Sequence, residues 1–204
     1  SSRSRRNLTR LRRRLEERGA VKLEIAADPA DVATAFDRFL KLEASGWKAG
    51  RGALSSDPQL AAFSRAATAA FAAAGACRIL SLTLDGAPVA MGVVFSSGGG
   101  AAFWKTAYDE RYSGFSPGVM LAVALTESLE AERAGGQIDS CAIADHPMID
   151  RLWKRRMRVG DALIAMRPRT TAAWRMAGAG EWMARGLRGV AKDAYYRISG
   201  KKRR

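Results

Sequence analysis

Phe103-Trp-Lys-Thr-Ala-Tyr-Asp-Glu-Arg-Tyr-Ser-Gly-Phe-Ser-Pro-Gly-Val-Met-Leu121 begins like a strand, passes through a polar aromatic loop and ends like a helix. Ser116 is a favoured N-cap residue, Pro117 suits the first helical position, and Gly118 lets a ligand approach the backbone closely. The acidic residues of this helix begin only at Glu127, so none of them neutralises the positive end of the helix dipole. The junction therefore predicts a site for phosphate or another anion. An ordinary helix start is the alternative.

Three strands in quick succession precede this junction. They are expected at Cys77–Leu84, Pro88–Ser96 and Ala101–Ala107, because these segments alternate or run apolar between turn residues. Asp85-Gly86 supplies the first hairpin turn. The segment predicts an antiparallel meander.

Helical and strand-like patterns alternate along the rest of the chain. The further expected elements are a basic helix in residues 1–18, a strand at Val21–Ile25, helices from Pro29 to about Ser45 and from Pro58 to Ala74, a helix from Pro117 to about Arg133, a strand at Gln137–Ile143, a short helix near Met148–Arg156 and a last strand at Val159–Arg167. This order predicts the class α/β or α+β, with a mixed, mostly antiparallel sheet flanked by helices.

Charge is unevenly distributed along the chain. Of the net charge of +14, residues 19–150 contribute −5, whereas residues 1–18, 151–169 and 170–204 contribute +6, +6 and +7. Basic ends on an acidic body are typical of charged tails, so the bulk charge is weak evidence for a nucleic-acid partner. We expect a basic helix at 1–18 that continues a missing N-terminal region, a body domain at 19–169, and a basic amphipathic tail at 170–204 that forms one or two helices around Gly178-Ala-Gly180.

Composition favours a cytoplasmic protein. No apolar run reaches the roughly 18 to 20 residues that span a bilayer, and the first residues are too rich in Arg for a secretory signal. The basic tail with Trp174 and Trp182 either lies on the anionic inner surface of a membrane or packs against an absent N-terminal domain. Cys77 and Cys141 lie in strand-like segments without metal or redox spacing, so we expect buried, reduced thiols and no metal site.

Several short sequence motifs, separated from one another along the chain, occur in a fixed order. They are Leu8, Leu11 and Leu15 in the Arg-rich segment, Leu42-Glu-Ala-Ser-Gly-Trp-Lys48, Lys105-Thr-Ala-Tyr-Asp109 with Tyr112, Ser116-Pro-Gly118, and Asp145-His-Pro147 followed by Trp153-Lys154. With these pieces the chain resembles the GNAT acyltransferase superfamily over about residues 5–167, specifically its Fem-related branch, often labelled as cellulose-biosynthesis-type acetyltransferase domains.

The resemblance implies a binding site for an acyl coenzyme A, acetyl-CoA or another. In that superfamily the strand before the helix and the helix N-terminus hold the pantetheine and the pyrophosphate. The candidate cofactor-binding residues are Ala107, Arg111, Gly114, Ser116, Pro117 and Gly118. The usual Arg/Gln-x-x-Gly-x-Gly/Ala signature is met only in part, because Ser116 stands in its last place.

Acyl transfer needs a base for the acceptor and an acid for the leaving thiolate. The candidate catalytic residues are Glu43, Asp145, His146 and Tyr108. His146, which is the only histidine, follows a predicted central strand, and Asp145 either orients it or acts as the base itself. The alternatives are a capping Asp145 beside a surface His146, a helix-end Glu43 and a solvent-facing Tyr108.

A further set of residues is suited to binding the acceptor: Trp47, Lys48, Lys105, Tyr112, Trp153 and Lys154. Trp47 offers a stacking face, and Lys105 suits an acidic acceptor or a phosphate. The basic residues around Lys154 either bind the phosphate of the coenzyme or form a solvated face.

The resemblance, together with the acid-free helix start, implies an acyl-CoA-dependent N- or O-acyltransferase, and the labels of the family imply an acetyltransferase that acts on a carbohydrate or cell-envelope-related acceptor in polysaccharide biosynthesis. Two alternatives stay open. One is a Fem-type aminoacyl transferase that uses charged tRNA, and the other is a non-catalytic binding module of the same fold that acts through its basic ends.

Overall fold

The computed structural model describes residues 2–46, 52–132, 136–143, 146, 148–157, 159–160, 162, 164 and 172–199. The chain divides into two compact units, Ser1–Ala144 and Asp145–Arg204. The predicted site residues Trp47, Lys48 and Asp145 lie outside the described residues.

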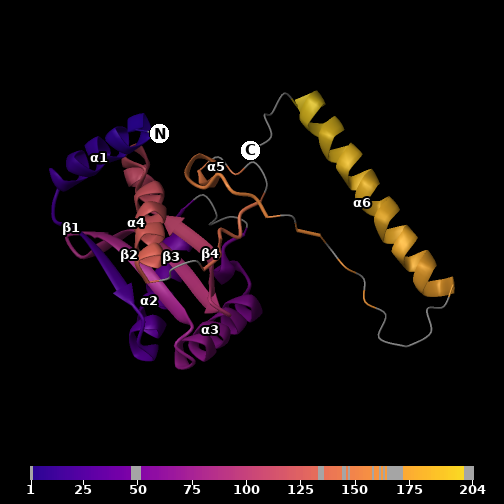
Figure 1. Ribbon diagram of the computed structural model, residues 1–204, viewed down its shortest axis with the longest axis horizontal. Coiled ribbons are helices and arrows are strands. Elements are labelled where there is room, and N and C mark those ends of the chain that lie inside the picture. The colour runs from indigo at the N-terminus through magenta and orange to yellow at the C-terminus, as the bar shows by residue number, and fades with distance from the viewer. Residues whose placement is uncertain are drawn as a thin grey trace. The chain divides into compact units, whose positions relative to one another are not determined.

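A five-stranded sheet forms the centre of the first unit (Figure 1). Its strands, in spatial order, are β1 (Val21–Ala26), β2 (Cys77–Leu84), β3 (Ala87–Ser97), β4 (Gly100–Tyr108) and β5 (Ile138–Asp139). The first four strands pair antiparallel, whereas β5 runs parallel to β4. The predicted mixed, mostly antiparallel sheet with flanking helices is confirmed.

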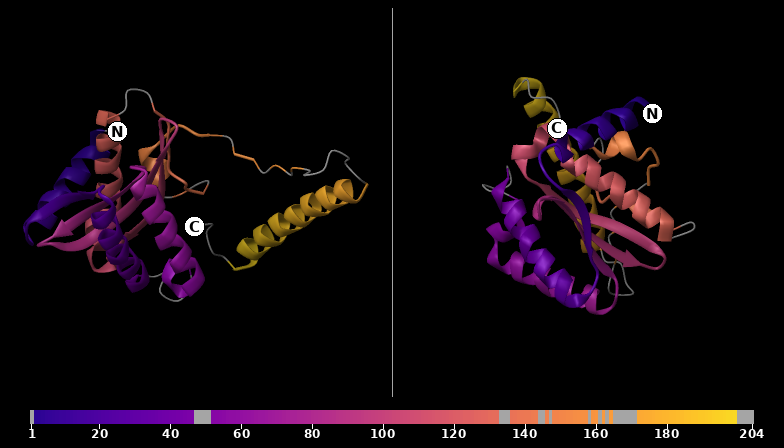
Figure 2. Two further views of the ribbon diagram at one scale, coloured as in Figure 1. Left: turned by 90° about the horizontal axis from the view of Figure 1, so that it is seen from below. Right: turned by 90° about the vertical axis from the view of Figure 1, so that its left-hand side faces the viewer.

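Helices cover both faces of this sheet. Figure 2 shows α2 (Pro29–Ser45) and α3 (Pro58–Ala73) on one face and α4 (Pro117–Glu132) on the other. The N-terminal helix α1 (Ser2–Glu16) packs against the short 3-10 helix η2 (Glu110–Phe115), which links β4 to α4. A second 3-10 turn, η1 (Leu54–Ser56), lies between α2 and α3.

The main core lies between α2 and the sheet. Val32, Phe36 and Phe39 of α2 are at most 1% exposed and pack with Ile79 of β2 and Met91 of β3. Full burial of such side chains stabilises the fold by roughly 1.5–3 kcal/mol each. The apolar stripe that the sequence places along α2 is therefore the principal contact between this helix and the sheet.

On the other face, α4 packs closely because β3 carries a glycine. A Cβ on Gly92 would lie 2.5 Å from the ring of Phe103 and 3.2 Å from a methyl group of Leu121. Leu121 and Leu125 of α4 are nearly fully buried. The missing side chain of Gly92 thus makes room for α4 beside the Phe103 ring.

A β-bulge in β4 changes which face its side chains occupy. Val93 pairs with Lys105 and Val94 with Phe103, so Trp104 is the extra residue of the bulge. Beyond a bulge the alternation of side chains shifts by one position. Phe103 therefore lies against α4, whereas both Trp104 and Lys105 lie on the side of α2.

α3 packs through small residues. Its buried positions are Ala61, Ser64, Thr68 and Ala72, whereas Phe63 is 68% exposed. Small side chains allow two helices to approach closely, and of the larger apolar residues of α3, Phe63 is exposed whereas Phe71 packs against the Phe95 ring of β3 at 4.7 Å.

The C-terminal part of the first unit differs from the prediction. β5 ends at Asp139 and does not continue to Ile143, because the Asp139 carboxylate accepts a hydrogen bond from the Cys141 amide at 2.8 Å and Cys141 adopts a left-handed conformation with φ of 50°. The expectation of a buried Cys141 thiol was therefore wrong, whereas that of a buried Cys77 is confirmed.

In the second unit, α5 (Ile149–Leu152) is shorter than the predicted helix, and no strand forms in the described part of residues 159–167. α6 (Ala172–Ser199) is one continuous helix, so of the one or two helices expected in the tail the structure has one, and Gly178-Ala-Gly180 does not interrupt it. Each glycine in a helix lowers the stability of that helix by about 1 kcal/mol relative to alanine. The helix of 28 residues continues through these glycines despite that cost. No helix in the described ranges is both long and apolar enough to cross a bilayer.

Candidate active site

The junction between β4 and α4 is ordered by one short ion pair. The Asp109 carboxylate accepts a hydrogen bond from the Arg111 amide at 3.0 Å, and Arg111 Nη2 lies 2.6 Å from Asp109 Oδ2. Hydrogen bonding from the Arg111 side chain lowers the pKa of Asp109 below its ordinary value. Arg111, predicted to bind the cofactor, is thus oriented by its neighbour while its side chain stays 84% exposed.

Ser116 begins α4 in an unusual conformation. Its φ and ψ of 56° and 50° lie in the left-handed region, whereas an N-cap residue is normally extended. For a non-glycine residue this costs on the order of 1 kcal/mol. The predicted position of Ser116 before the helix is confirmed, but its conformation is different from that of a usual N-cap.

Most amides at the start of α4 already have acceptors. The Ser116 amide donates to the Ser113 carbonyl at 3.0 Å, and the amides of Val119 and Met120 donate to the Ser116 carbonyl at 3.0 and 3.2 Å. Pro117 has no amide hydrogen. Among the described residues, none accepts a hydrogen bond from the Gly118 amide, so the set of available amides is smaller than the sequence suggested.

The charge at this helix start agrees with the prediction. The first turn of α4 contains no acidic residue, and both Pro117 and Gly118 are buried. An anion here would meet the positive end of the helix dipole and the Gly118 amide. Gly114 lies at the surface of η2, and a Cβ there would meet no atom within 4 Å.

One edge of β4 is left largely uncovered by β5. Within the described residues the β4–β5 ladder pairs only Ala101 with Ile138 and Ala102 with Asp139. The strand continues to Tyr108, and Ala107 places its side chain in the core against α2. Ala107 can therefore meet an extended ligand only through its backbone, as strand edges do when they bind peptide-like chains.

Aromatic and cationic side chains meet beside the junction. The rings of Tyr112 and Phe115 lie 6.5 Å apart, and the guanidinium carbons of Arg14 and Arg18 lie 5.8 and 4.9 Å from the centre of the Phe115 ring. Sequence reasoning did not identify Phe115, Arg14 or Arg18 as site residues. The recurrence of arginine at every fourth position of the first helix was the available signal.

Glu43 and Lys105 form a pair across 62 residues of sequence. Lys105 Nζ lies 2.7 Å from Glu43 Oε1, and the Leu54 amide donates to Glu43 Oε2 at 2.8 Å. The Glu43 side chain is 0% exposed and that of Lys105 is 23% exposed. The pair joins the end of α2, the η1 turn and β4, so the geometry gives both residues a positioning role. A role for Glu43 as base stays a prediction.

Tyr108 is the last residue of β4 and is half-buried. Its place next to Asp109 puts it at the junction, one residue before the ion pair with Arg111. Tyr112 lies within η2 and is also half-buried. Both aromatic candidates therefore belong to the same short segment as the start of α4.

The remaining candidates belong to the second unit. His146 Nδ1 accepts a hydrogen bond from the Ile149 amide at 3.3 Å, so this side chain caps α5. Trp153 is half-buried, and Lys154 Nζ donates to the Asp150 carbonyl at 2.9 Å. Their proposed roles stay predictions. Within the described residues there is no group of three or more His, Cys, Asp or Glu side chains placed to hold a metal ion.

Comparison with known structures identifies similar folds. An aminoglycoside acetyltransferase, meta-AAC0020, from an uncultured soil metagenomic sample, solved in complex with sisomicin, has a TM-score of 0.51 at 11% identity, covering 72% of this chain and 97% of its own. A ribosomal-protein-alanine N-acetyltransferase from Brucella melitensis biovar Abortus 2308 has a TM-score of 0.45 at 16% identity, covering 72% of this chain and 99% of its own. At 11% identity, the likeness to the aminoglycoside acetyltransferase is one of fold alone.

Comparison with protein families is more direct. No curated protein matches the chain. Residues 2–155, however, match the family model described as an acetyltransferase (GNAT) domain, which spans β1 to β5 and the junction before α4. The protein therefore belongs to the GNAT acetyltransferases, enzymes that use acetyl-CoA.

Proposed function

We propose that this acetyltransferase binds acetyl-CoA along the uncovered edge of β4 and at the start of α4, and acetylates an amine or hydroxyl group of a carbohydrate or other cell-envelope-related acceptor. Two neighbouring features carry the proposal. Within the described residues, the pairing of β4 with β5 ends at Ala102, and the first turn of α4, which follows β4, contains no acidic residue. An extended pantetheine suits the first feature and a pyrophosphate suits the second.

The residues at this junction provide hydrogen-bond donors of the types that bind the phosphates of a coenzyme. Acetyl-CoA supplies an activated thioester when bound. Gly118 offers an amide in a position where a bulky side chain would obstruct a phosphate, and Arg111 stands at the same junction, fixed by Asp109. These groups would orient the donor, while the chemistry falls to a base for the acceptor and an acid for the leaving thiolate.

Tyr108 is our candidate for the acid, because it ends β4 directly before the junction. Asp145 and His146 remain our candidates for the base. Glu43 is the weaker candidate, since both of its carboxylate oxygens already accept hydrogen bonds in the core. Its role is better explained as holding Lys105 in place.

The first test is a titration of the purified protein with acetyl-CoA, followed by thermal shift and calorimetry. We expect stabilisation of the wild type and its loss in Gly118→Val, with partial loss in the smaller Gly118→Ala. Gly186→Val in α6 is a matched control that should retain binding. The proposal is abandoned if neither acetyl-CoA nor another short acyl-CoA binds the wild type while its melting is cooperative.

The acceptor is then sought by following release of the free coenzyme thiol. The panel should hold amino sugars, polysaccharide fragments and sisomicin, because the resemblance to cellulose-biosynthesis-type domains and the solved aminoglycoside acetyltransferase both support a carbohydrate-like acceptor. Acetylation of protein N-termini alone, with no carbohydrate acetylated, would contradict this part of the proposal.

The Fem-type alternative is supported by the basic ends of the chain, which suit charged tRNA. It predicts RNA binding that weakens steeply with salt and transfer of an aminoacyl group in place of an acetyl group. Activity with acetyl-CoA and without tRNA would exclude it.

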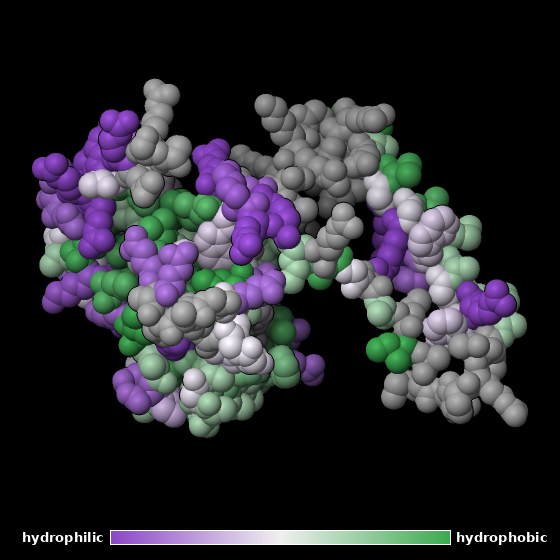
Figure 3. Space-filling model, viewed as in Figure 1, coloured by the Kyte–Doolittle hydropathy of each residue, from purple (hydrophilic) through white to green (hydrophobic). Residues whose placement is uncertain are grey.

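We also propose that α6 lies on an anionic membrane surface from the cytoplasmic side. Large apolar side chains along this basic helix are exposed, among them Trp182 at 76%, Leu187 at 69% and Ile198 at 88% (Figure 3). One apolar and one cationic face is what interfacial binding requires. Co-sedimentation with anionic vesicles, but not with neutral ones, should be lost in Leu187→Glu/Ile198→Glu. Equal sedimentation of this variant would refute the proposal.

A further inference from the structure

A row of arginines runs along the first helix. Arg6, Arg10 and Arg14 of α1 and Arg18 in the turn after it recur at every fourth position, and we call them the arginine row. Residues four apart lie on neighbouring turns of one helix face. Hydrophilic residues gather over α1 in the space-filling view (Figure 3).

We propose that the arginine row is part of the coenzyme site and binds the phosphates of acetyl-CoA. This inference rests on the proposed function, and it assigns to α1 a binding role that the signature around Arg111 does not include. Three features of the protein support this role: the row ends at Phe115, its charge near the junction is not neutralised by the described residues, and the start of α4 has few hydrogen-bond donors for a phosphate.

The row ends at the junction before α4. Arg14 and Arg18 hold their guanidinium carbons 5.8 and 4.9 Å from the centre of the Phe115 ring. Phe115 precedes Gly118 by three residues, which limits the separation of their backbones to about 11 Å. Leu15 is 0% exposed and fixes α1 in the fold. One elongated anionic ligand can therefore touch both the start of α4 and the end of the row.

The charge of the row near the junction is not neutralised by the described residues. The acidic residues nearest to the row in sequence are Glu16, at the end of α1, and Glu17, in the turn after it. Glu16 pairs with Arg12 at 3.0 Å. Arg10 donates to the Asn7 side chain, and no carboxylate of the described chain lies within ion-pair distance of Arg14 or Arg18. A guanidinium that lies over an aromatic ring is held by a cation–π contact, which leaves its N–H groups able to donate to another ligand.

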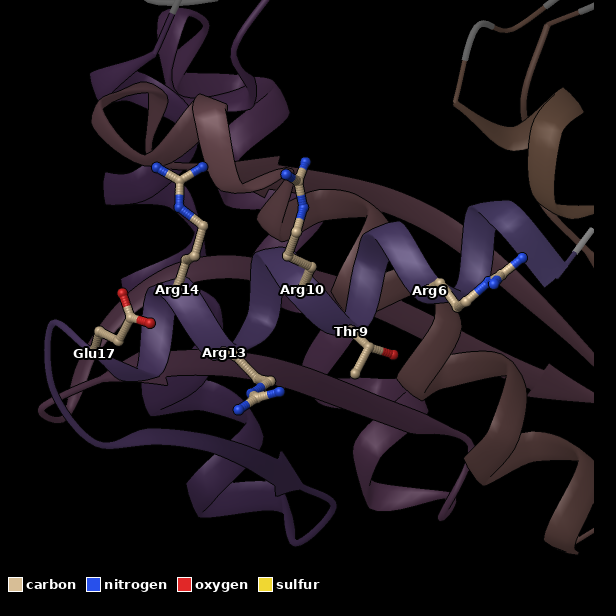
Figure 4. A pocket seen from close by; sticks show the side chains of 6 residues that line it. All are labelled: Arg6, Thr9, Arg10, Arg13, Arg14 and Glu17. Carbon is tan, nitrogen blue, oxygen red and sulfur yellow. The ribbon is translucent and has the colours of Figure 1, made fainter.

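A cavity lies along the same side of α1. It has a volume of about 420 Å³ and is lined by Arg6, Thr9, Arg10, Arg13, Arg14 and Glu17. Figure 4 shows Arg10 and Arg14 projecting to the same side of the helix, while Arg13 points to the other. Arg14 thus lines the cavity and also stacks on Phe115, which connects the cavity to the junction.

Phosphate is the ligand chemistry that this arrangement fits. Among the described residues, the start of α4 supplies the Gly118 amide and the helix dipole, which is little for a pyrophosphate. Arginine binds phosphate through two parallel hydrogen bonds, each stronger than a neutral one. Because coenzyme A carries a pyrophosphate and a further phosphate on its ribose, several arginines in a row suit it better than a single cation.

The test compares donors with and without the phosphate-bearing nucleotide of the coenzyme. Calorimetry with the full chain should give dissociation constants for acetyl-CoA and for acetyl-pantetheine, which has no phosphate. For Arg14→Gln and Arg18→Gln we expect the acetyl-CoA constant to rise about tenfold, the effect of losing one charge-assisted contact. The acetyl-pantetheine constant should not change. Arg12→Gln, on the same helix and paired with Glu16, is the matched control and should bind acetyl-CoA as the wild type does.

Salt and a conservative variant add two independent readouts. The acetyl-CoA constant of the wild type should rise with salt more steeply than that of Arg14→Gln, because each removed cation lowers the number of screened contacts. Arg18→Lys keeps the charge and loses the paired hydrogen bonds, so it should fall between the wild type and Arg18→Gln.

The outcomes separate the two proposals. If the wild type binds acetyl-CoA and both Gln variants bind it equally well, the arginine row is not part of the site and the proposed function stands. If the variants lose acetyl-pantetheine to the same degree, α1 acts only through the fold and the inference is overturned. If they lose binding to tRNA with acetyl-CoA affinity unchanged, the row serves nucleic acid. No binding of acetyl-CoA by the wild type overturns both proposals.

Discussion

Breaking the pair of Glu43 and Lys105 should destabilise the fold unequally from its two sides. Lys105→Met removes the cation that pairs with the Glu43 carboxylate, whose side chain is 0% exposed. An uncompensated buried charge of this kind costs about 3–5 kcal/mol. Glu43→Gln keeps an oxygen for the Leu54 amide and leaves an ammonium that is 23% exposed and so partly hydrated. We expect its cost to be about 1–2 kcal/mol, because a lost hydrogen bond to a charged group costs about 1.5–3 kcal/mol and hydration of the ammonium offsets part of that cost.

The assay is urea unfolding followed by circular dichroism. With a slope of about 1–3 kcal/mol per molar urea, Lys105→Met should lower the midpoint by about 2 M and Glu43→Gln by less than 1 M. The double variant should be more stable than Lys105→Met alone, because it removes both charges together. Arg65→Met, which breaks the exposed pair with Asp37, is the control and should leave the midpoint unchanged.

Two results would refute this reasoning. Equal or larger destabilisation by Glu43→Gln would mean that the lysine is the more enclosed partner. Additive effects in the double variant would mean that the two side chains do not interact. A large loss of kcat in Glu43→Gln, with stability and KM for acetyl-CoA unchanged, would restore Glu43 as a catalytic base.

Further changes test other parts of the fold. Gly92→Ala places a Cβ 2.5 Å from an aromatic ring carbon of β4 and should lower thermal stability by about 1–3 kcal/mol; an unchanged melting temperature would contradict the close packing of α4. Thiol reagents should modify Cys141 in the folded protein and spare Cys77, whose pKa burial raises to about 11; mass spectrometry of peptides decides this. Because Arg111 lowers the folded pKa of Asp109 below its unfolded value, the ionised pair stabilises the fold above about pH 4, and this contribution is lost as the pH falls through the lowered value. The stability difference between wild type and Arg111→Gln should therefore shrink below about pH 4, and a constant difference would argue against the pair.

Local signals in the sequence were enough for most of the fold. Asp85 and Gly86 adopt φ values of 49° and 79°, the positive angles that a two-residue hairpin needs, and the meander follows from that turn. Pro29 and Pro58 start α2 and α3, where a proline is tolerated because its missing amide is not needed. Each signal acts within a few residues, so a single sequence suffices to locate it.

Two features of the structure were not predicted. The end of β5 depends on one side-chain hydrogen bond from the Cys141 amide, which competes with the strand ladder. The orientation of α3 depends on how closely its small residues approach α2, and the composition of the helix alone does not give it. The end of β5 was decided by a hydrogen bond between near neighbours that competes with the strand ladder, and the orientation of α3 by its packing on α2.

The sequence by itself determined the order of elements from α1 to α4, the meander and the acid-free start of α4, because turns, caps and charge act between near neighbours. Only the tertiary structure decided what meets at that start. The bulge at Trp104 turns Lys105 toward Glu43, and the packing of α1 on η2 brings Arg14 and Arg18 to Phe115. These contacts join residues more than 60 positions apart, and a shift of strand register or helix position by one residue would break them.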